Sequence, residues 1–229
     1  IYTGSSEFIC LRNGLHGRTK LTMSMTGIGM WRTDPNPVGG ISFAPNPYCY
    51  RCPLGKTYPE CDLACANAVE DIIKTNTSGK VAAFFAEPIQ GNAGIITPPP
   101  GYFQRLKEIL DKYNILLVVD EVQTGFGRTG KMFAIENFNI VPDIMTVAKA
   151  LGNGTPISAF IATAQIADSY VKPGASTLGG NPVSSTAALA TLDYIDSENL
   201  ISKATERGQQ LFNGLKTLRD KHQIIGDIR

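Results

Sequence analysis

The sequence has almost no excess of charge of either sign and no long hydrophobic run. Its 229 residues include 21 Lys and Arg against 20 Asp and Glu, a formal net charge of +1. A charge so close to zero gives no electrostatic reason to bind nucleic acid or an anionic membrane. No apolar stretch reaches the roughly 18 residues that a transmembrane helix needs. We therefore predict a soluble globular chain without nucleic-acid or membrane partners.

Charged residues as a whole are also scarce, at 18% of the chain against roughly 25% in typical globular domains. Hydrophobic residues make up 43%, which is enough to build a core. Because charged residues are few, part of the surface is expected to be covered in an oligomer. The chain starts at Ile1 and shows no signal-peptide pattern. We interpret it as part of a longer chain and expect a cytoplasmic location. A mitochondrial location stays open, because a removed transit peptide leaves no trace.

Apolar segments of strand length alternate with amphipathic segments of helix length. Strands are predicted at residues 7–12, 81–86, 115–120, 143–148 and 156–163, and helices at residues 64–76, 102–113, 181–194 and 200–221. Several of the strands are apolar throughout and are separated by helices. This pattern predicts an α/β fold with a mostly parallel sheet that is covered by helices on both faces.

Proline-rich residues 35–59 are predicted to form a long ordered loop, a kind of segment that is often functional. A domain boundary is predicted near residues 197–199, where an alanine-rich helix gives way to a charged one. Residues 1–196 would then form most of a large domain, and residues 197–229 the start of a smaller C-terminal domain. Residues 223–229 are predicted to begin a further strand.

A glycine-rich segment, Gly125–Lys131, matches two phosphate-binding patterns but stands in the wrong context for both. The nucleotide P-loop needs Ser or Thr after its lysine, and Met132 stands there. The dinucleotide fingerprint needs its first glycine at the end of a strand, whereas residues 120–124 intervene. We therefore interpret this segment as a turn that uses the conformational freedom of glycine.

Asp120 ends one apolar strand, and Lys149 follows the next strand along the chain. The carboxyl ends of parallel strands form the edge where open α/β sheets bind ligands. Lys149 has apolar and small neighbours, so it is expected to be desolvated, which favours a neutral amine suited to Schiff-base chemistry. Asp120 could then keep a pyridine nitrogen protonated. Spacing alone favours a simpler interpretation, in which Asp120 caps a turn and Lys149 extends to solvent.

The sequence segments around these two residues resemble those of the class III pyridoxal-phosphate-dependent aminotransferases. The matching segments are YTG at 2–4, HGRT at 16–19, AEPIQG at 86–91, DEVQTGFGRTG at 120–130, PDIMTVAK at 142–149, GNG at 152–154 and TLGGNP at 177–182. The resemblance implies the fold type I of pyridoxal-phosphate-dependent transferases, the aspartate aminotransferase superfamily. It also implies a seven-stranded, mostly parallel sheet, of which this chain holds part, and a homodimer or tetramer with shared active sites.

The resemblance assigns a role to each matching residue. Lys149 would form a Schiff base with pyridoxal 5'-phosphate and transfer the substrate proton, and Asp120 would pair with the pyridine nitrogen. Val122 and Gln123 would pack against the ring and contact its 3-hydroxyl side. Thr177 would reach the cofactor phosphate of the neighbouring subunit, so that each active site needs a dimer.

Further residues are placed by the same resemblance on the cofactor face and at the substrate. Leu15, His16 and Gly17 would lie over the cofactor, although the family usually has an aromatic residue where Leu15 stands. Glu87 would act toward the substrate, pairing with an arginine of the C-terminal domain and swinging aside for dicarboxylates. The cofactor-phosphate turn and that arginine are expected outside residues 1–229.

The implied activity is the transfer of an amino group from an amino acid or omega-amino acid, of the alanine, 4-aminobutyrate or β-amino acid type, to a 2-oxo acid. Glyoxylate, pyruvate or 2-oxoglutarate would be the acceptor, because the sequence of this chain is similar to those of the alanine–glyoxylate and 4-aminobutyrate aminotransferase subgroups. Another pyridoxal-phosphate enzyme of the same fold, an aminomutase, racemase or decarboxylase, would keep Lys149 and Asp120 and remains an alternative.

Four of the five cysteines, Cys49, Cys52, Cys61 and Cys65, are spaced at intervals close to those of metal ligands. Zinc, an iron–sulfur cluster or a non-catalytic metal-binding module are therefore alternatives for this segment. Tyrosines around these cysteines and the apolar helix start at Cys65 favour free buried thiols in a reducing compartment. We accordingly assign no metal to the catalytic site.

Overall fold

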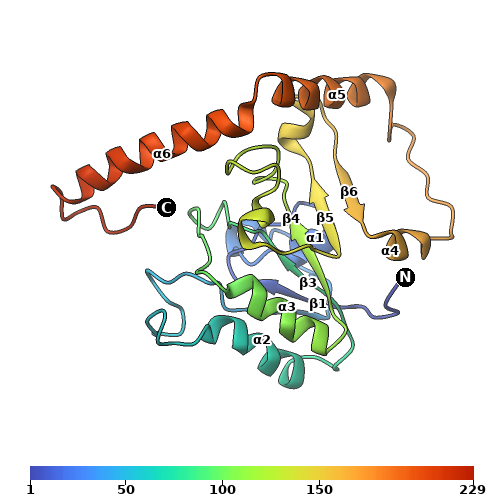
Figure 1. Ribbon diagram of the computed structural model, residues 1–229. Coiled ribbons are helices and arrows are strands. Elements are labelled where there is room, and N and C mark those ends of the chain that lie inside the picture. Colours follow the sequence, from blue (N-terminus) through green and yellow to red (C-terminus); the bar gives the residue numbers. More distant parts are fainter.

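The computed structural model describes residues 1–229 and contains one six-stranded sheet (Figure 1). The strands are β1 (Glu7–Leu11), β2 (Ile41–Ala44), β3 (Val81–Ala86), β4 (Leu116–Asp120), β5 (Ile144–Val147) and β6 (Ala159–Ala162). Their order is β2-β1-β3-β4-β5-β6, and all neighbours are parallel except β5 and β6. The predicted α/β class and mostly parallel sheet are confirmed, with six strands in this chain rather than seven.

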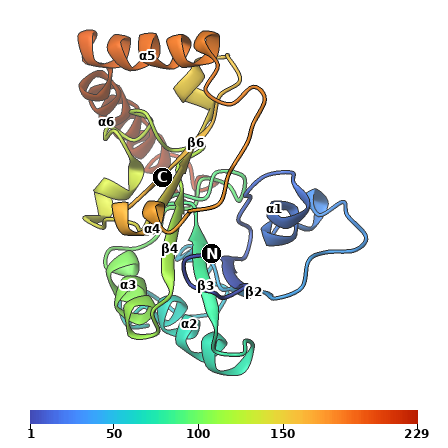
Figure 2. The same ribbon diagram turned by 90° about the vertical axis from the view of Figure 1, so that its right-hand side faces the viewer.

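Helices connect and follow these strands. They are α1 (Lys20–Met25), α2 (Ala64–Thr75), α3 (Tyr102–Lys112), α4 (Ala164–Asp168), α5 (Pro182–Ser197) and α6 (Leu200–Arg219), with short 3-10 helices η1 (Gly29–Trp31), η2 (Ala134–Phe138) and η3 (Lys149–Gly152). Figures 1 and 2 show α2 and α3 side by side on the sheet, whereas α6 extends away from it and buries no residue. None of the helices combines the length and the apolar character that crossing a membrane requires. The domain division after residue 196 stays a prediction.

The main core lies between the sheet and helices α2 and α3. Ile9, Phe84 and Leu117 stand in register across β1, β3 and β4, and all three are completely buried. Because side chains alternate between the two faces of a strand, this register gathers one apolar row on one face. The row belongs to the same core cluster as Phe103 and Leu106 of α3.

The opposite face of the sheet forms an apolar groove. Phe85 and Val118 stand in register on β3 and β4, and with Ile144 and Phe160 they line the groove. Phe160 is 72% exposed. In this chain, helices α2 and α3 cover one face of the sheet, while the groove on the other face is bordered by the first residues of the chain and by α4.

Two segments differ from the sequence prediction. The passage 35–59 is not a continuous loop, because the proline-free residues Ile41–Ala44 pair with β1 as strand β2. Residues 223–229 form no strand, because they lack a strand partner and their one backbone hydrogen bond joins Ile225 N–H to His222 in a turn. In both segments the outcome depends on whether a strand partner is available, which the local sequence does not show.

The completely buried side chain of Leu106 provides a test of this core. Leu106→Ala removes apolar contacts and leaves a cavity, so the free energy of unfolding is expected to fall by about 2–5 kcal/mol. The matched control is Leu211→Ala on α6, where Leu211 is 65% exposed and the change should stay below about 0.5 kcal/mol. Urea denaturation measures both values, and equal losses would contradict the assigned core.

Candidate active site

Ionisable side chains lie at or after the ends of four neighbouring parallel strands, at one edge of the sheet. His16 follows β1, Glu87 comes directly after β3, Asp120 ends β4, and Lys149 stands two residues beyond the end of β5. The order β1-β3-β4-β5 places these four strand ends next to one another at their carboxyl side. This is the edge at which open α/β sheets bind ligands.

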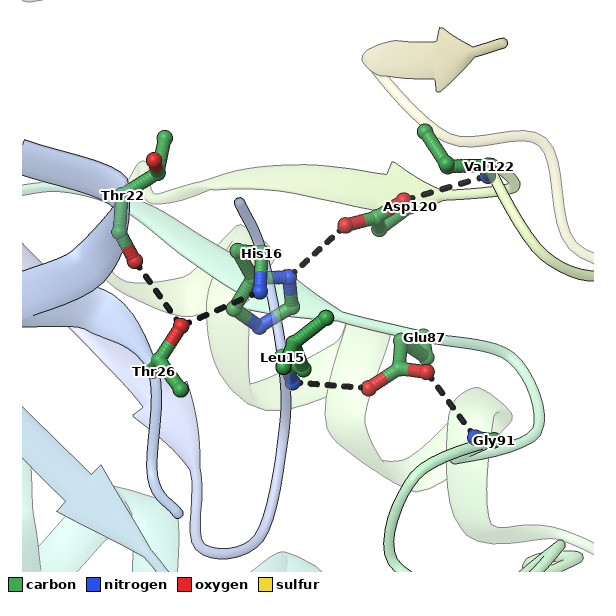
Figure 3. Close-up of polar contacts among 8 residues, drawn as sticks. All are labelled: Leu15, His16, Thr22, Thr26, Glu87, Gly91, Asp120 and Val122. Carbon is green, nitrogen blue, oxygen red and sulfur yellow. Dashed lines mark hydrogen bonds and ion pairs between the residues drawn. The ribbon is translucent and has the colours of Figure 1, made fainter. Parts of the chain in front are cut away.

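A hydrogen bond between His16 and Asp120 forms the centre of the site (Figure 3). His16 Nδ1 and Asp120 Oδ2 are 2.9 Å apart, and the two side chains are only 2% and 10% exposed. Asp120 Oδ1 accepts a second hydrogen bond, from the Val122 N–H at 3.1 Å. An ionised carboxylate can only accept, so His16 Nδ1 carries the proton in this contact. Both carboxylate oxygens are therefore fixed in orientation.

The loop after β1 holds His16 in place. Thr26 Oγ1 accepts from the His16 N–H at 3.2 Å and donates to the Thr22 carbonyl at 3.0 Å (Figure 3). The Phe85 ring meets the imidazole edge-on, with ring centroids 5.9 Å apart. At Gly27 a Cβ atom would lie 2.7 Å from the backbone of the β1 loop, so only glycine fits there.

The Glu87 carboxylate accepts hydrogen bonds from two different loops (Figure 3). The buried Glu87 accepts from the Leu15 N–H through Oε1 and from the Gly91 N–H through Oε2, both at 2.9 Å. Burial raises the pKa of Glu87, partly opposed by the N–H groups of Gly91 and Leu15. Because backbone groups occupy both oxygens, Glu87 positions the chain beside His16. Its expected role toward the substrate stays a prediction.

Lys149 is exposed rather than desolvated, so the prediction of an apolar environment for its amine is wrong for this structure. The backbone of Lys149 has a left-handed conformation, with φ of +46°, between the buried residues Val147 and Leu151. A left-handed conformation is strained for a residue with a Cβ, and such strain is concentrated at functional positions. The ammonium group donates a hydrogen bond to Gln123 Oε1.

The structure brings most of the predicted site residues together. Gln123 belongs to the loop after β4 and contacts Lys149 after β5, so it links the segments that carry Asp120 and the lysine. Gly17 lies half-buried beside His16. Thr177 is exposed between α4 and α5, and no hydrogen bond or ion pair joins it to the other site residues.

Sequence reasoning missed residues that support the site. Besides Thr26 and Phe85, the completely buried Glu121 contacts Thr124 and accepts from the Ile135 N–H at 2.8 Å, which anchors the loop after Asp120. Burial raises the pKa of Glu121. The only local signal for Glu121 was its place next to Asp120, because its backbone partner, Ile135, lies 14 residues away in η2.

All five cysteines are free, but only Cys10 and Cys65 are buried. The prediction of buried thiols is therefore wrong for Cys49, which is exposed, and for Cys52 and Cys61, which are half-buried on the loop. Burial raises the pKa of Cys10 to about 12 and that of Cys65 to about 11. No group of three or more His, Cys, Asp or Glu side chains has the arrangement of a metal-binding set.

The fold and the site define an α/β protein with buried polar side chains at the carboxyl edge of a mostly parallel sheet. A family model described as aminotransferase class-III matches residues 2–229. The chain therefore belongs to the class-III aminotransferase family, as the sequence predicts. This family depends on pyridoxal phosphate, in agreement with the predicted cofactor.

Individual relatives show the same relationship. The leucine/methionine racemase of Thermococcus litoralis is 43% identical, over 100% of this chain and 52% of the racemase. An alanine–glyoxylate aminotransferase 2 homolog of Arabidopsis thaliana mitochondria is 39% identical, over 100% of this chain and 47% of that protein. The solved PLP-bound amine transaminase of an uncultivated Pseudomonas species is 34% identical with a TM-score of 0.92, over 100% of this chain and 54% of that one. The chain spans about half the length of the curated relatives it matches.

The buried Glu87 carboxylate is expected to make stability depend on pH. Its pKa is raised above the ordinary 4.5, so the folded state binds the proton more tightly than the unfolded state. Stability from this group is complete below pH 4.5 and is lost as the pH rises through the raised pKa. Glu87→Gln removes the titration, so the difference in free energy of unfolding between wild type and variant should decrease over this range.

Urea denaturation at a series of pH values measures this difference. At low pH the variant is expected to be less stable by about 1–3 kcal/mol, because both oxygens of the protonated carboxyl group can still accept from a backbone N–H, whereas the amide NH2 cannot. Glu206→Gln on the exposed part of α6 is the matched control and should change stability by less than about 0.5 kcal/mol. A difference for Glu87→Gln that stays constant with pH would contradict the assignment.

Proposed function

We propose that the protein containing this chain binds pyridoxal 5'-phosphate with Lys149 and Asp120 and catalyses transamination. The observation that carries the proposal is the placement of a fixed, buried carboxylate at the end of β4 and an accessible amine beyond the end of β5. Membership in the class-III aminotransferase family supports the same activity. The reaction class is therefore the transfer of a nitrogenous group.

The residues present fit this cofactor. A protonated pyridine nitrogen needs an acceptor, and each Asp120 oxygen keeps a lone pair after its contact with His16 or Val122. An aldehyde needs an amine, and Lys149 Nζ has only the neutral Gln123 side chain as a polar partner. When bound, pyridoxal phosphate supplies an electron-withdrawing ring that stabilises negative charge on the substrate carbon.

Asp120 would hold the proton on the ring nitrogen in this proposal. His16 Nδ1 and the Val122 N–H hold the carboxylate in one orientation, because each donates a hydrogen bond to one oxygen. Glu87 contributes indirectly, since it fixes the backbone of Leu15 directly before His16. Leu15 and Gly17 would then lie against the face of the cofactor.

Lys149 would move the substrate proton. Its amine, once neutral, accepts the proton from the carbon that bears the amino group and delivers it elsewhere, while Gln123 limits the directions that Nζ can take. Val122 and Gln123 would also contact the ring. Thr177 would contact the phosphate of the cofactor in a neighbouring subunit, which would require a homodimer or tetramer with shared sites.

The proposed donors are an amino acid or omega-amino acid of the alanine, 4-aminobutyrate or β-amino acid type, and the proposed acceptors are glyoxylate, pyruvate or 2-oxoglutarate. The Arabidopsis relative named as an alanine–glyoxylate aminotransferase supports this choice. A racemase is the second candidate, because the racemase of Thermococcus litoralis is 43% identical to this chain. Lys149 and Asp120 would serve either reaction.

Removal of the Lys149 amine tests cofactor binding. The full-length protein reconstituted with pyridoxal phosphate is expected to show a visible absorption band that Lys149→Ala abolishes, because alanine has no amine to react with the aldehyde. Activity should fall by more than about 1,000-fold. Lys203→Ala, which removes an exposed lysine of α6, is the matched control and should keep both the band and the activity. A wild-type protein without such a band would overturn the proposed cofactor site.

Product analysis separates the two candidate reactions. A panel of amine donors with pyruvate, 2-oxoglutarate and glyoxylate is expected to give one oxo product for each amino group transferred. A racemase would instead invert a single enantiomer without any oxo acid and without net transfer. Chiral chromatography of the amino acids, together with quantification of oxo acids, measures both. Inversion without oxo product in all combinations would contradict transamination while keeping the cofactor site.

A further inference from the structure

Four of the five cysteines surround one small pocket beside the start of α2. Cys49, Cys52, Cys61 and Cys65 all line it, although they come from a loop and from the first turn of the helix. The fifth cysteine, Cys10, lies in β1 and does not line the pocket. None of the four takes part in the catalytic proposal, so their convergence needs a separate explanation.

Turns in the backbone produce this convergence. The Gly55 N–H donates to the Cys52 carbonyl at 3.0 Å, and the Cys61 N–H donates to the Thr57 carbonyl at 2.8 Å. Two left-handed residues, Asp62 and Leu63, with φ of +46° and +51°, then reverse the chain between Cys61 and α2. The loop therefore folds back on itself, although it contains no regular secondary structure of its own.

One cationic side chain lies beside the cysteines, because Lys56 lines the same pocket. Cys65 stands in the first turn of α2, where the N-cap residue Leu63 makes no side-chain hydrogen bond. The pocket thus combines four soft sulfur ligands with a positive charge that would offset the negative charge of metal-bound thiolates.

We propose that Cys49, Cys52, Cys61 and Cys65 form a structural site for a zinc ion. Four thiolates at such spacing are a typical tetrahedral zinc set, and binding releases the thiol protons as the Zn–S bonds form. In the structure the thiols surround the pocket without yet forming a ligand set, so the exposed Cys49 side chain must rotate inward. Zinc would fasten the loop to the start of α2 in place of a helix cap.

Metal analysis of the full-length wild-type protein, purified under anaerobic and reducing conditions, tests the proposal without any substitution. We expect about one zinc ion per chain. After zinc is removed, titration with Co²⁺ should produce the intense thiolate-to-cobalt band and the visible bands of tetrahedral cobalt, saturating at one equivalent. Protein without zinc that also gives no thiolate–cobalt band would overturn the proposal. Iron with acid-labile sulfide on these cysteines would overturn it as well.

Substitutions then assign the ligands. Cys52→Ala and Cys61→Ala should each weaken Co²⁺ binding by more than the roughly 10-fold loss typical of outer-shell changes. Cys10→Ala is the matched control and should leave the cobalt spectrum and its saturation unchanged. Equal Co²⁺ binding by all three variants would contradict the assigned ligands. The visible band of pyridoxal phosphate is a separate readout and should persist in protein that lacks zinc, so failure of this proposal is distinguishable from failure of the catalytic one.

Discussion

The buried hydrogen bond between His16 and Asp120 is the interaction on which the geometry of the site depends. It joins the loop after β1 to the end of β4 across the intervening strand β3, over a separation of 104 residues. The contact is possible because the three strands are parallel and end at one edge. A buried carboxylate without partners is unfavourable, so the donors that fix Asp120 also make its burial possible. The hydrogen bonds that orient the Asp120 carboxylate therefore also stabilise it in its buried position.

The buried carboxylates of Glu87 and Glu121 are likewise paired with backbone hydrogen-bond donors. Glu87 accepts from two backbone N–H groups, and Glu121 accepts from the Ile135 N–H, so each buried acid anchors a loop that lacks regular structure. Burial raises the pKa of both glutamates, which shows that the donors only partly offset desolvation. The site edge is therefore held by buried polar contacts, in contrast to the apolar packing of α2 and α3 on the sheet. Its geometry should respond to pH more than the core does.

Local signals in the sequence were sufficient for some parts of the structure and not for others. Strands β3 and β4 were predictable because they are continuous apolar runs, and their carboxyl ends identified Asp120. Strand β2 was not, because its four residues stand among prolines and depend on pairing with β1. The contacts of Glu87 and the support of His16 by Thr26 could not be predicted, since backbone donors have no sequence signature. The exposure of Lys149 was missed because its left-handed turn is not encoded by its apolar neighbours.

The chemistry proposed for this edge would be common to transamination and racemisation, so Lys149 and Asp120 alone would not decide between the two reactions. In this proposal Asp120 would influence how strongly the cofactor ring withdraws electrons, a requirement common to both reactions. The outcome would instead depend on where Lys149 Nζ returns the proton. Gln123 is the one polar side chain that contacts this amine in the chain, and its position is fixed by the loop that Glu121 anchors. The support of that loop would therefore bear on the choice between the two proposed reactions, although none of its buried residues reaches the amine.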